Sequence, residues 1–155
     1  MRCFNWVRPL LTRWLDSRLD SPLSLLDRDD FESSGEWNEY IGEIGEALAE
    51  KHCWRTRRVP LYRNFRAPGG GELDLVARED DVLIFCEVKT RTSERFGRPS
   101  KAVDQEKQRL IAKGANAWLR ELGHPDIIYR FDIIEVLLTS GEVPEINHIK
   151  GAFNT

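Results

Sequence analysis

Two stretches of this sequence alternate charged residues with apolar ones. The stretch ELDLV begins with Glu72 and Asp74, and VLIFCEVKTR (residues 82–91) carries Glu87 and Lys89 after five apolar residues. Alternate residues of a strand leave on the same face, so each charged pair should point in one direction, and Leu73 and Leu75 should leave on the opposite face from Glu72 and Asp74. Taken alone, the charges of the second stretch favour a strand end that meets water.

A short turn at residues 79–81 should join the two stretches as an antiparallel hairpin. Neighbouring strands lie only ~4.7 Å apart, so Asp74, Glu87 and Lys89 could converge at one end of it. Two carboxylates repel each other unless a positive charge lies between them, and a hard divalent cation prefers oxygen ligands. A bound metal lowers the pKa of its water, and Lys89 could orient that water or stabilise charge developing on a phosphate.

A further carboxylate, Glu46, lies in GEIGEALAE on the flank of an apolar helical stripe. Gly42 and Gly45 each cost a helix roughly 1 kcal/mol relative to alanine, which indicates that another group approaches closely there. The alternative is an ordinary acidic surface row, and helix periodicity alone favours that alternative.

The chain has 155 residues and a net charge of −3, with a composition typical of one globular domain. No stretch approaches the roughly 18 consecutive apolar residues of a membrane span, so we expect no membrane partner. The three cysteines have no C-x-x-C spacing and predict reduced thiols in a cytoplasmic protein. The three histidines lie far apart in sequence, so a zinc site is not expected.

The charge is unevenly distributed along the chain. Residues 16–50 hold 2 basic and 11 acidic groups, whereas residues 51–120 hold 16 basic and 9 acidic groups. A basic region inside an acidic protein is typical of a surface that contacts a phosphate backbone. A solvated, ion-paired surface would produce the same count.

Hydrophobic periodicity predicts an α/β protein with a mixed sheet and helices packed on it. Residues 1–36 are expected to be an N-terminal extension, helical or partly disordered, and residues 37–155 the folded domain. The expected elements are a helix over 37–53, strands over 59–65, 72–78 and 82–90, a helix over 104–122, a strand over 127–138 and a possible short strand over 143–149.

Several motifs in order carry a family resemblance. RNFRAPGGGELDLVARE followed by LIFCEVKTRTSERFGRPSKAVDQEKQRL closely resembles the YraN-like family of small bacterial proteins. The resemblance runs from about Glu39 to Phe153, includes GEIGEALA, RFD and HIKGAF, and leaves out residues 1–36. That family is similar to the PD-(D/E)xK nuclease superfamily of restriction endonucleases and Holliday junction resolvases. The resemblance implies a restriction endonuclease-like three-layer fold of core order αβββαβ.

The resemblance also implies residue roles. Asp74 and Glu87 would be metal ligands for Mg²⁺ or Mn²⁺, with the Val88 carbonyl often a third ligand. Lys89 would be the catalytic lysine, and Glu46 would support the metal site directly or through water. The family's usual GEIDLI is GELDLV here, a change that leaves both acids in place.

A further set of residues is expected to contact nucleic acid. Arginine binds phosphate oxygens bidentately, although charged residues also protect a strand edge from pairing. Arg58 lies just upstream of the first strand, and it too could either contact phosphate or protect the strand edge. The candidates are Arg63, Asn64, Arg66, Arg91, Arg95, Arg98, Gln105 and Lys107.

Three functions follow as hypotheses. The first is a divalent-metal-dependent endonuclease that hydrolyses phosphodiester bonds in nucleic acid, with DNA, branched or structured, as the expected substrate. The second is a nucleic-acid-binding or assembly module with the same fold and little or no hydrolysis. The third is a structural protein whose charged strand ends form ion pairs. A homodimer is expected only by analogy with junction-cutting relatives.

Overall fold

The computed structural model describes residues 19–93 and 103–154 of the chain. These residues form two α-helices, a short 3₁₀ helix and five strands. In chain order the elements are η1 (Arg28–Asp30), α2 (Ser34–Arg55), β1 (Val59–Arg66), β2 (Glu72–Glu79), β3 (Val82–Arg91), α3 (Gln105–Glu121), β4 (Ile128–Leu137) and β5 (Glu145–Phe153).

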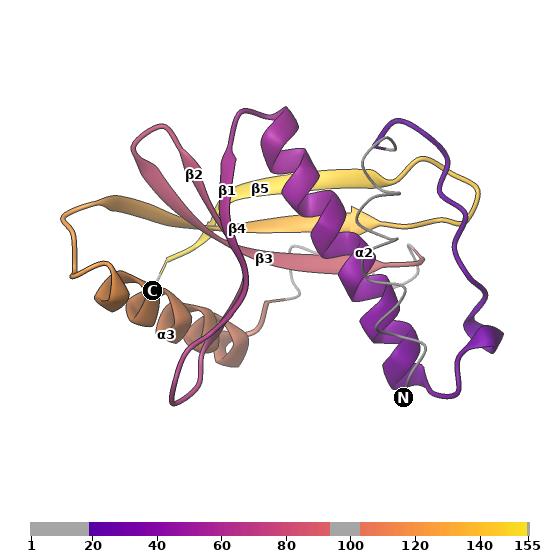
Figure 1. The fold of residues 1–155 in the computed structure, drawn as a ribbon, viewed down its shortest axis with the longest axis horizontal. Helices are drawn as coiled ribbons and strands as arrows, with labels where there is room; N and C mark the ends of the chain where they lie inside the picture. Colours follow the sequence, from indigo (N-terminus) through magenta and orange to yellow (C-terminus); the bar gives the residue numbers. More distant parts are fainter. Residues whose placement is uncertain (1–18, 94–102, 155) are drawn as a thin grey trace.

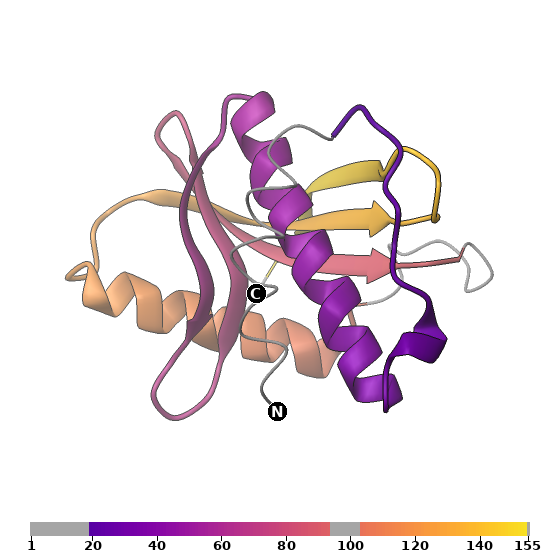
Figure 2. The ribbon, with the colours of Figure 1, turned by 45° about the vertical axis from the view of Figure 1, so that its right-hand side comes forward.

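The five strands form one mixed sheet in the order β1-β2-β3-β4-β5. Only the β3–β4 pair is parallel, and α3 supplies the crossover between these two strands. The two helices lie on opposite faces of the sheet, which gives three layers (Figures 1 and 2). Strand β3 shows the division most clearly, because Ile84 and Cys86 pack in the cluster of α2 whereas Leu83 and Phe85 pack in the cluster of α3.

The sequence therefore predicted the fold class correctly. The order of elements after α2 is the expected βββαβ with a final strand, and the architecture is compatible with a restriction endonuclease-like fold. None of the helices in the described part of the chain has the length and apolar character needed to cross a membrane.

Two element boundaries differ from the prediction. Helix α2 begins three residues early, because the Ser33 side chain accepts a hydrogen bond from Glu36 N at 3.2 Å and so caps the helix. Strand β5 continues to Phe153, four residues beyond the expected end, because its far half pairs with Phe131 across an irregularity in the ladder. Periodicity does not detect a strand that a bulge interrupts.

Residues just before α2 join the core. Leu19 and Leu23 are 8% and 1% exposed and belong to the same cluster as the buried face of α2. Leu23 N also donates a hydrogen bond to Glu142 O at 2.9 Å, which ties this segment to the turn before β5. The division of the chain at residue 36 stays a prediction, and most of the expected N-terminal helix lies outside the described residues.

One face assignment on β2 was wrong. Leu73 and Leu75 were expected on one face of the strand, but Leu73 packs in the cluster of α3 and Leu75 in the cluster of α2. Their partners Phe65 and Arg63 on β1 flank Asn64, which has a φ of 53°. A left-handed residue interrupts the regular strand geometry, and asparagine tolerates this conformation better than most residues.

The two helix glycines were expected to mark close approaches, and only Gly45 does. A Cβ on Gly45 would lie 1.7 Å from Thr90 Oγ1 and 2.8 Å from Thr90 Cβ, so α2 approaches β3 closely at this point. A Cβ on Gly42 would meet no atom within 4 Å among the described residues, so no other segment of the described chain approaches closely there. Gly45 therefore fixes the distance between α2 and the end of β3.

These glycines make a matched pair of substitutions. Gly45→Ala should lower the free energy of unfolding by about 1–3 kcal/mol, because the new methyl group would overlap with Thr90. Gly42→Ala should raise it by about 0.5–1 kcal/mol, because alanine favours the helix and the methyl group enters open space. Urea unfolding of the two variants beside wild type measures both effects. Equal effects of the two substitutions would contradict the close approach at Gly45.

Candidate functional site

The two carboxylates expected at the hairpin end lie beside each other. The β2–β3 ladder runs from Glu79↔Val82 to Leu75↔Cys86, so Asp74 and Glu87 follow directly beyond its last pair. Asp74 Oδ2 accepts a hydrogen bond from the Val88 backbone N–H at 2.8 Å, which fixes the Asp74 side chain against β3. The expected hairpin therefore places both carboxylates where the sequence analysis put them.

Glu87 is buried between two lysines. Its residue exposure is 2%, and its Oε1 lies 2.8 Å from Lys89 Nζ on the same strand. Its Oε2 lies 3.3 Å from Lys107 Nζ of α3, yet it is buried and accepts no hydrogen bond from the residues that the structure describes. Lys107 Nζ also contacts Glu72 Oε1 at 2.5 Å. An ionised carboxylate at this depth needs such partners, because desolvation of an unpaired charge is costly.

Asp74 has a different environment from Glu87. Burial and the negative charge of Glu87 together raise the pKa of Asp74 to about 7, although the Val88 N–H and Lys107 act in the other direction. Glu46 adds a smaller repulsion from α2. A carboxyl group with a pKa near 7 is partly protonated at neutral pH. A cation beside it would lower this pKa and favour the ionised form.

Glu46 lies on α2 with contacts to β1. Its Oε2 accepts a hydrogen bond from Asn64 Nδ2 at 2.8 Å and lies 3.5 Å from Arg63 Nη2. Arg63 Nη1 also contacts Glu50 Oε2 at 3.0 Å. Two of the residues expected to contact nucleic acid are thus engaged with helix carboxylates.

The donor set fits a hard divalent cation. Asp74, Glu87 and the Val88 carbonyl would offer only oxygen atoms, which is the preference of Mg²⁺ and Mn²⁺. The buried Glu87 Oε2 accepts no hydrogen bond, and burial and the negative charge of Glu87 raise the pKa of Asp74. The three carboxylates, including Glu46, do not form a group in which all ligand atoms lie within 4.8 Å among the described residues.

The other expected nucleic-acid contacts are distributed around this site. Arg66 and Gln105 are exposed, at the end of β1 and at the first turn of α3, and Arg91 ends β3. Asp104 caps α3 by accepting a hydrogen bond from Lys107 N at 2.8 Å, and so helps to orient the turn that carries Lys107. Arg95 and Arg98 lie outside the described residues.

Arg58 does not contribute to a phosphate-binding surface. It is 7% exposed, and its Nη2 lies 2.9 Å from Glu79 Oε1. The phosphate-binding interpretation was wrong for this residue, because the partly exposed carboxylate of Glu79 at the end of β2 pairs with it.

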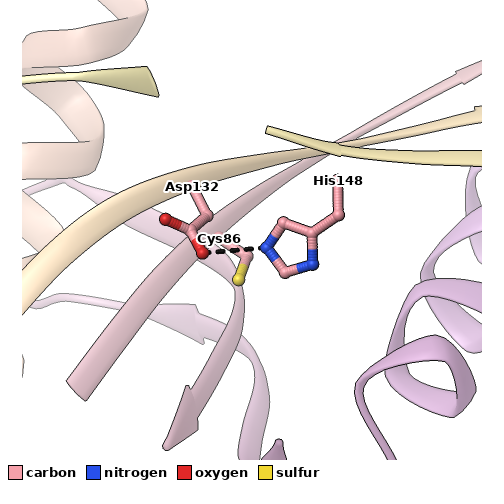
Figure 3. A group of neighbouring side chains, drawn as sticks. All are labelled: Cys86, Asp132 and His148. Carbon is pink, nitrogen blue, oxygen red and sulfur yellow. Dashed lines mark hydrogen bonds and ion pairs between the residues drawn. The ribbon is translucent and has the colours of Figure 1, made fainter. Parts of the chain in front are cut away.

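A second group of polar residues was not predicted as a site. Cys86, Asp132 and His148 bring their ligand atoms within 4.8 Å of one another on the α2 side of the sheet (Figure 3). Asp132 also accepts a hydrogen bond from Arg130 Nε at 3.0 Å. Sequence distance hid the rest of this group, because the three residues lie on three strands that become neighbours only in the folded sheet.

The raised pKa of Asp74 predicts a distinct pH dependence of stability without metal. The native state keeps the Asp74 proton between about pH 4 and pH 7, where the unfolded state has lost it. The free energy of unfolding should therefore fall by about 2–4 kcal/mol as pH rises through this window. Asp74→Asn should remove this slope, as measured by urea unfolding in EDTA. The charged groups that face Asp74 are Glu87, Lys107 and Glu46.

The matched control is Asp126→Asn, at an exposed position before β4. Its stability curve should run parallel to that of wild type over the same pH range. A curve of Asp74→Asn that also runs parallel to wild type would contradict the assignment of the raised pKa to Asp74.

Known proteins share this sequence over most of its length. The sequence model described as "Uncharacterised protein family UPF0102" matches residues 45–136. A UPF0102 protein of Geobacter metallireducens is 46% identical over 116 residues, which cover 75% of this chain and 93% of the relative. Relatives in Geobacter sulfurreducens and Rhodococcus jostii are 45% and 39% identical over 116 residues, covering 90% and 98% of their lengths. The chain therefore belongs to the UPF0102 family, in agreement with the YraN-like resemblance.

Proposed function

We propose that this protein is a Mg²⁺- or Mn²⁺-dependent nuclease that hydrolyses phosphodiester bonds in nucleic acid, with DNA as the expected substrate. The observation that supports this most directly is the burial of Asp74 beside Glu87, with Lys89 and Lys107 as neighbours. Two adjacent carboxylates repel each other and lower the stability of a protein. Such pairs are therefore typical of functional sites, where a ligand requires both groups.

Asp74, Glu87 and the Val88 carbonyl would hold the cation. When bound, such an ion supplies Lewis acidity and lowers the pKa of a coordinated water. Lys89, with its Nζ 2.8 Å from Glu87, would orient the attacking water and stabilise charge on the phosphate. Lys107 would hold Glu72 and Glu87 in place through its contacts with both, and Glu46 would act through its contacts with Asn64 and Arg63.

Positive side chains close to this site would hold the nucleic-acid backbone. Arg66 at the end of β1 is exposed, and Lys113 on α3 lies beside the loop that joins β1 to β2, with its Nζ 2.5 Å from Gly69 O. Both positions belong to the basic central segment of the sequence. Contacts of this kind position a phosphate backbone without reading its sequence.

A second function has its own supporting observation. Lys89 and Lys107 already neutralise Glu87, and Arg63 and Asn64 already engage Glu46. The site is therefore largely charge-balanced without metal, as a module that only binds nucleic acid would require. Cleavage and metal binding distinguish the two functions.

Metal binding should show in thermal stability. Millimolar Mg²⁺ or Mn²⁺ should raise the Tm of wild type, because a ligand that binds only the native state stabilises it by mass action. Asp74→Ala should need at least tenfold more metal than wild type for the same rise in Tm, whereas Asp126→Ala should need the same concentration as wild type. Indistinguishable titrations of wild type and Asp74→Ala would remove the support for this metal site.

Cleavage is the direct test of the enzyme hypothesis. Wild type should cut at least one member of a panel of linear, flapped and four-way DNA and structured RNA in Mg²⁺ or Mn²⁺. Lys89→Ala should lower the rate by about 10²-fold or more, because it removes a charged group at the reacting centre. Lys150→Ala is the control, since Lys150 pairs with Glu79 instead. If wild type cuts no substrate faster than Lys89→Ala does, and still binds these nucleic acids, the result would favour the binding module.

A further inference from the structure

The group formed by Cys86, Asp132 and His148 lies on three neighbouring strands. Cys86 on β3 is the direct partner of Asp132 on β4, and His148 on β5 pairs with Ile134, two residues beyond Asp132. All three side chains lie on the face of the sheet that α2 covers, and Figure 3 shows them converging. The fold therefore gathers a sulfur, an oxygen and a nitrogen atom with mutual distances of at most 4.8 Å.

Asp132 is held in one orientation. It is fully buried, and its Oδ1 accepts hydrogen bonds from Gly151 N at 2.9 Å and from Arg130 Nε at 3.0 Å. Its Oδ2 lies 2.8 Å from His148 Nε2. Burial alone would raise the pKa of Asp132, but the hydrogen bonds from His148, Arg130 and Gly151 outweigh it and keep the carboxylate ionised.

His148 has an unsatisfied ring nitrogen. Its side chain is 7% exposed, and its Nδ1 is buried without a hydrogen-bond partner among residues 19–93 and 103–154. A buried polar atom without a partner costs roughly 1–3 kcal/mol. The other ring nitrogen, Nε2, is the one that points toward Asp132 and Cys86 in Figure 3, so Nε2 is the ligand atom that His148 offers to this group.

We propose that Cys86, Asp132 and His148 bind a zinc ion. A donor set of thiolate, imidazole and carboxylate selects zinc over Mg²⁺, which prefers oxygen atoms alone. On binding, the Cys86 S–H bond is replaced by an S–Zn bond, and the proton leaves to solvent. A zinc ion bound by one thiolate and one carboxylate has no net charge. The Arg130 guanidinium beside Asp132 therefore does not repel the bound zinc complex.

The role of this zinc is structural. It would join β3, β4 and β5 at one point, and Cys86 immediately precedes Glu87 on β3. The site is closed by α2, because Cys86 and Asp132 are fully buried and the His52 ring lies 5.6 Å from the His148 ring. The three residues leave the fourth position of a tetrahedral zinc to a water molecule. Because only the folded sheet brings the three ligands together, binding would stabilise the native state. The proposal is independent of the proposed nuclease site, whose ligands would be the oxygen atoms of Asp74, Glu87 and the Val88 carbonyl.

The test measures zinc and cobalt binding by the full-length chain. The purified protein is stripped with a chelator, reduced and dialysed against Zn²⁺ or Co²⁺, and its metal content is measured together with its Tm. Wild type should hold one zinc per chain and show a higher Tm with zinc, and its cobalt form should show a thiolate-to-cobalt charge-transfer band. Cys86→Ala should lose this band and bind zinc at least 100-fold more weakly.

Two controls make the result specific. Cys53→Ala removes the other buried cysteine of the described residues and should bind zinc as wild type does. Asp74→Asn should also leave zinc binding unchanged, which separates this site from the carboxylates of the proposed nuclease centre. Failure of wild type to bind zinc, absence of the charge-transfer band from its cobalt form, or an equal loss in Cys86→Ala and Cys53→Ala would overturn the proposal. The cobalt spectrum of wild type decides the matter if Cys86→Ala does not fold.

Discussion

Asp74 and Glu87 are two carboxylates that lie beside each other, so the elements around them must supply hydrogen bonds and positive charge. Two carboxylates on neighbouring strands repel each other, and burial makes their ionised forms costly. Glu87 stays paired because Lys89 and Lys107 reach it from β3 and α3. Asp74 receives a backbone hydrogen bond from Val88 and keeps a pKa of about 7. The sheet and both helices must keep their relative positions for this balance to hold.

Close backbone contacts set those positions. Gly45 brings α2 against Thr90 at the end of β3, so that Glu46 lies on the side of the helix that faces β1. On the other face, a Cβ on Gly71 would lie 2.6 Å from Gly114 N, so the loop before β2 fits closely against α3. Gly71 also has a φ of 102°, which favours glycine. This contact keeps α3, and with it Lys107, beside the start of β2.

The opposite ends of the same strands carry a second charged network. Glu79 at the end of β2 contacts Arg58, Arg130 and Lys150, and Arg130 in turn contacts Asp132. These contacts lower the pKa of Glu79 to about 2, although burial acts in the other direction. The sheet thus has one end where positive and negative charges are matched and one end where Asp74 lacks a full counter-charge. That difference separates a structural network from a candidate site.

Much of this arrangement could be predicted from the sequence. The alternating charges of ELDLV and CEVKT, the short turn between them and the apolar stripe of α2 are local patterns, so they predicted the hairpin, the helix and the convergence of Asp74 with Glu87. Features that depend on distant pairs could not be predicted in this way. The contact of Lys107 with Glu72, the pairing of Arg58 with Glu79 and the grouping of Cys86 with His148 each need the folded sheet. The left-handed Asn64 likewise separated Leu73 from Leu75, which alternation alone had placed together.

The metal site is tested most directly by a crystal structure of the protein with Mn²⁺, in which the anomalous scattering of manganese locates the ion. We expect one anomalous peak, coordinated by Asp74, Glu87 and the Val88 carbonyl. Lys107 or Lys89 should then be displaced from its contact with Glu87. A map with no manganese at these residues, and with Glu87 still held by both lysines, would contradict the central claim that this pair of carboxylates is a metal site.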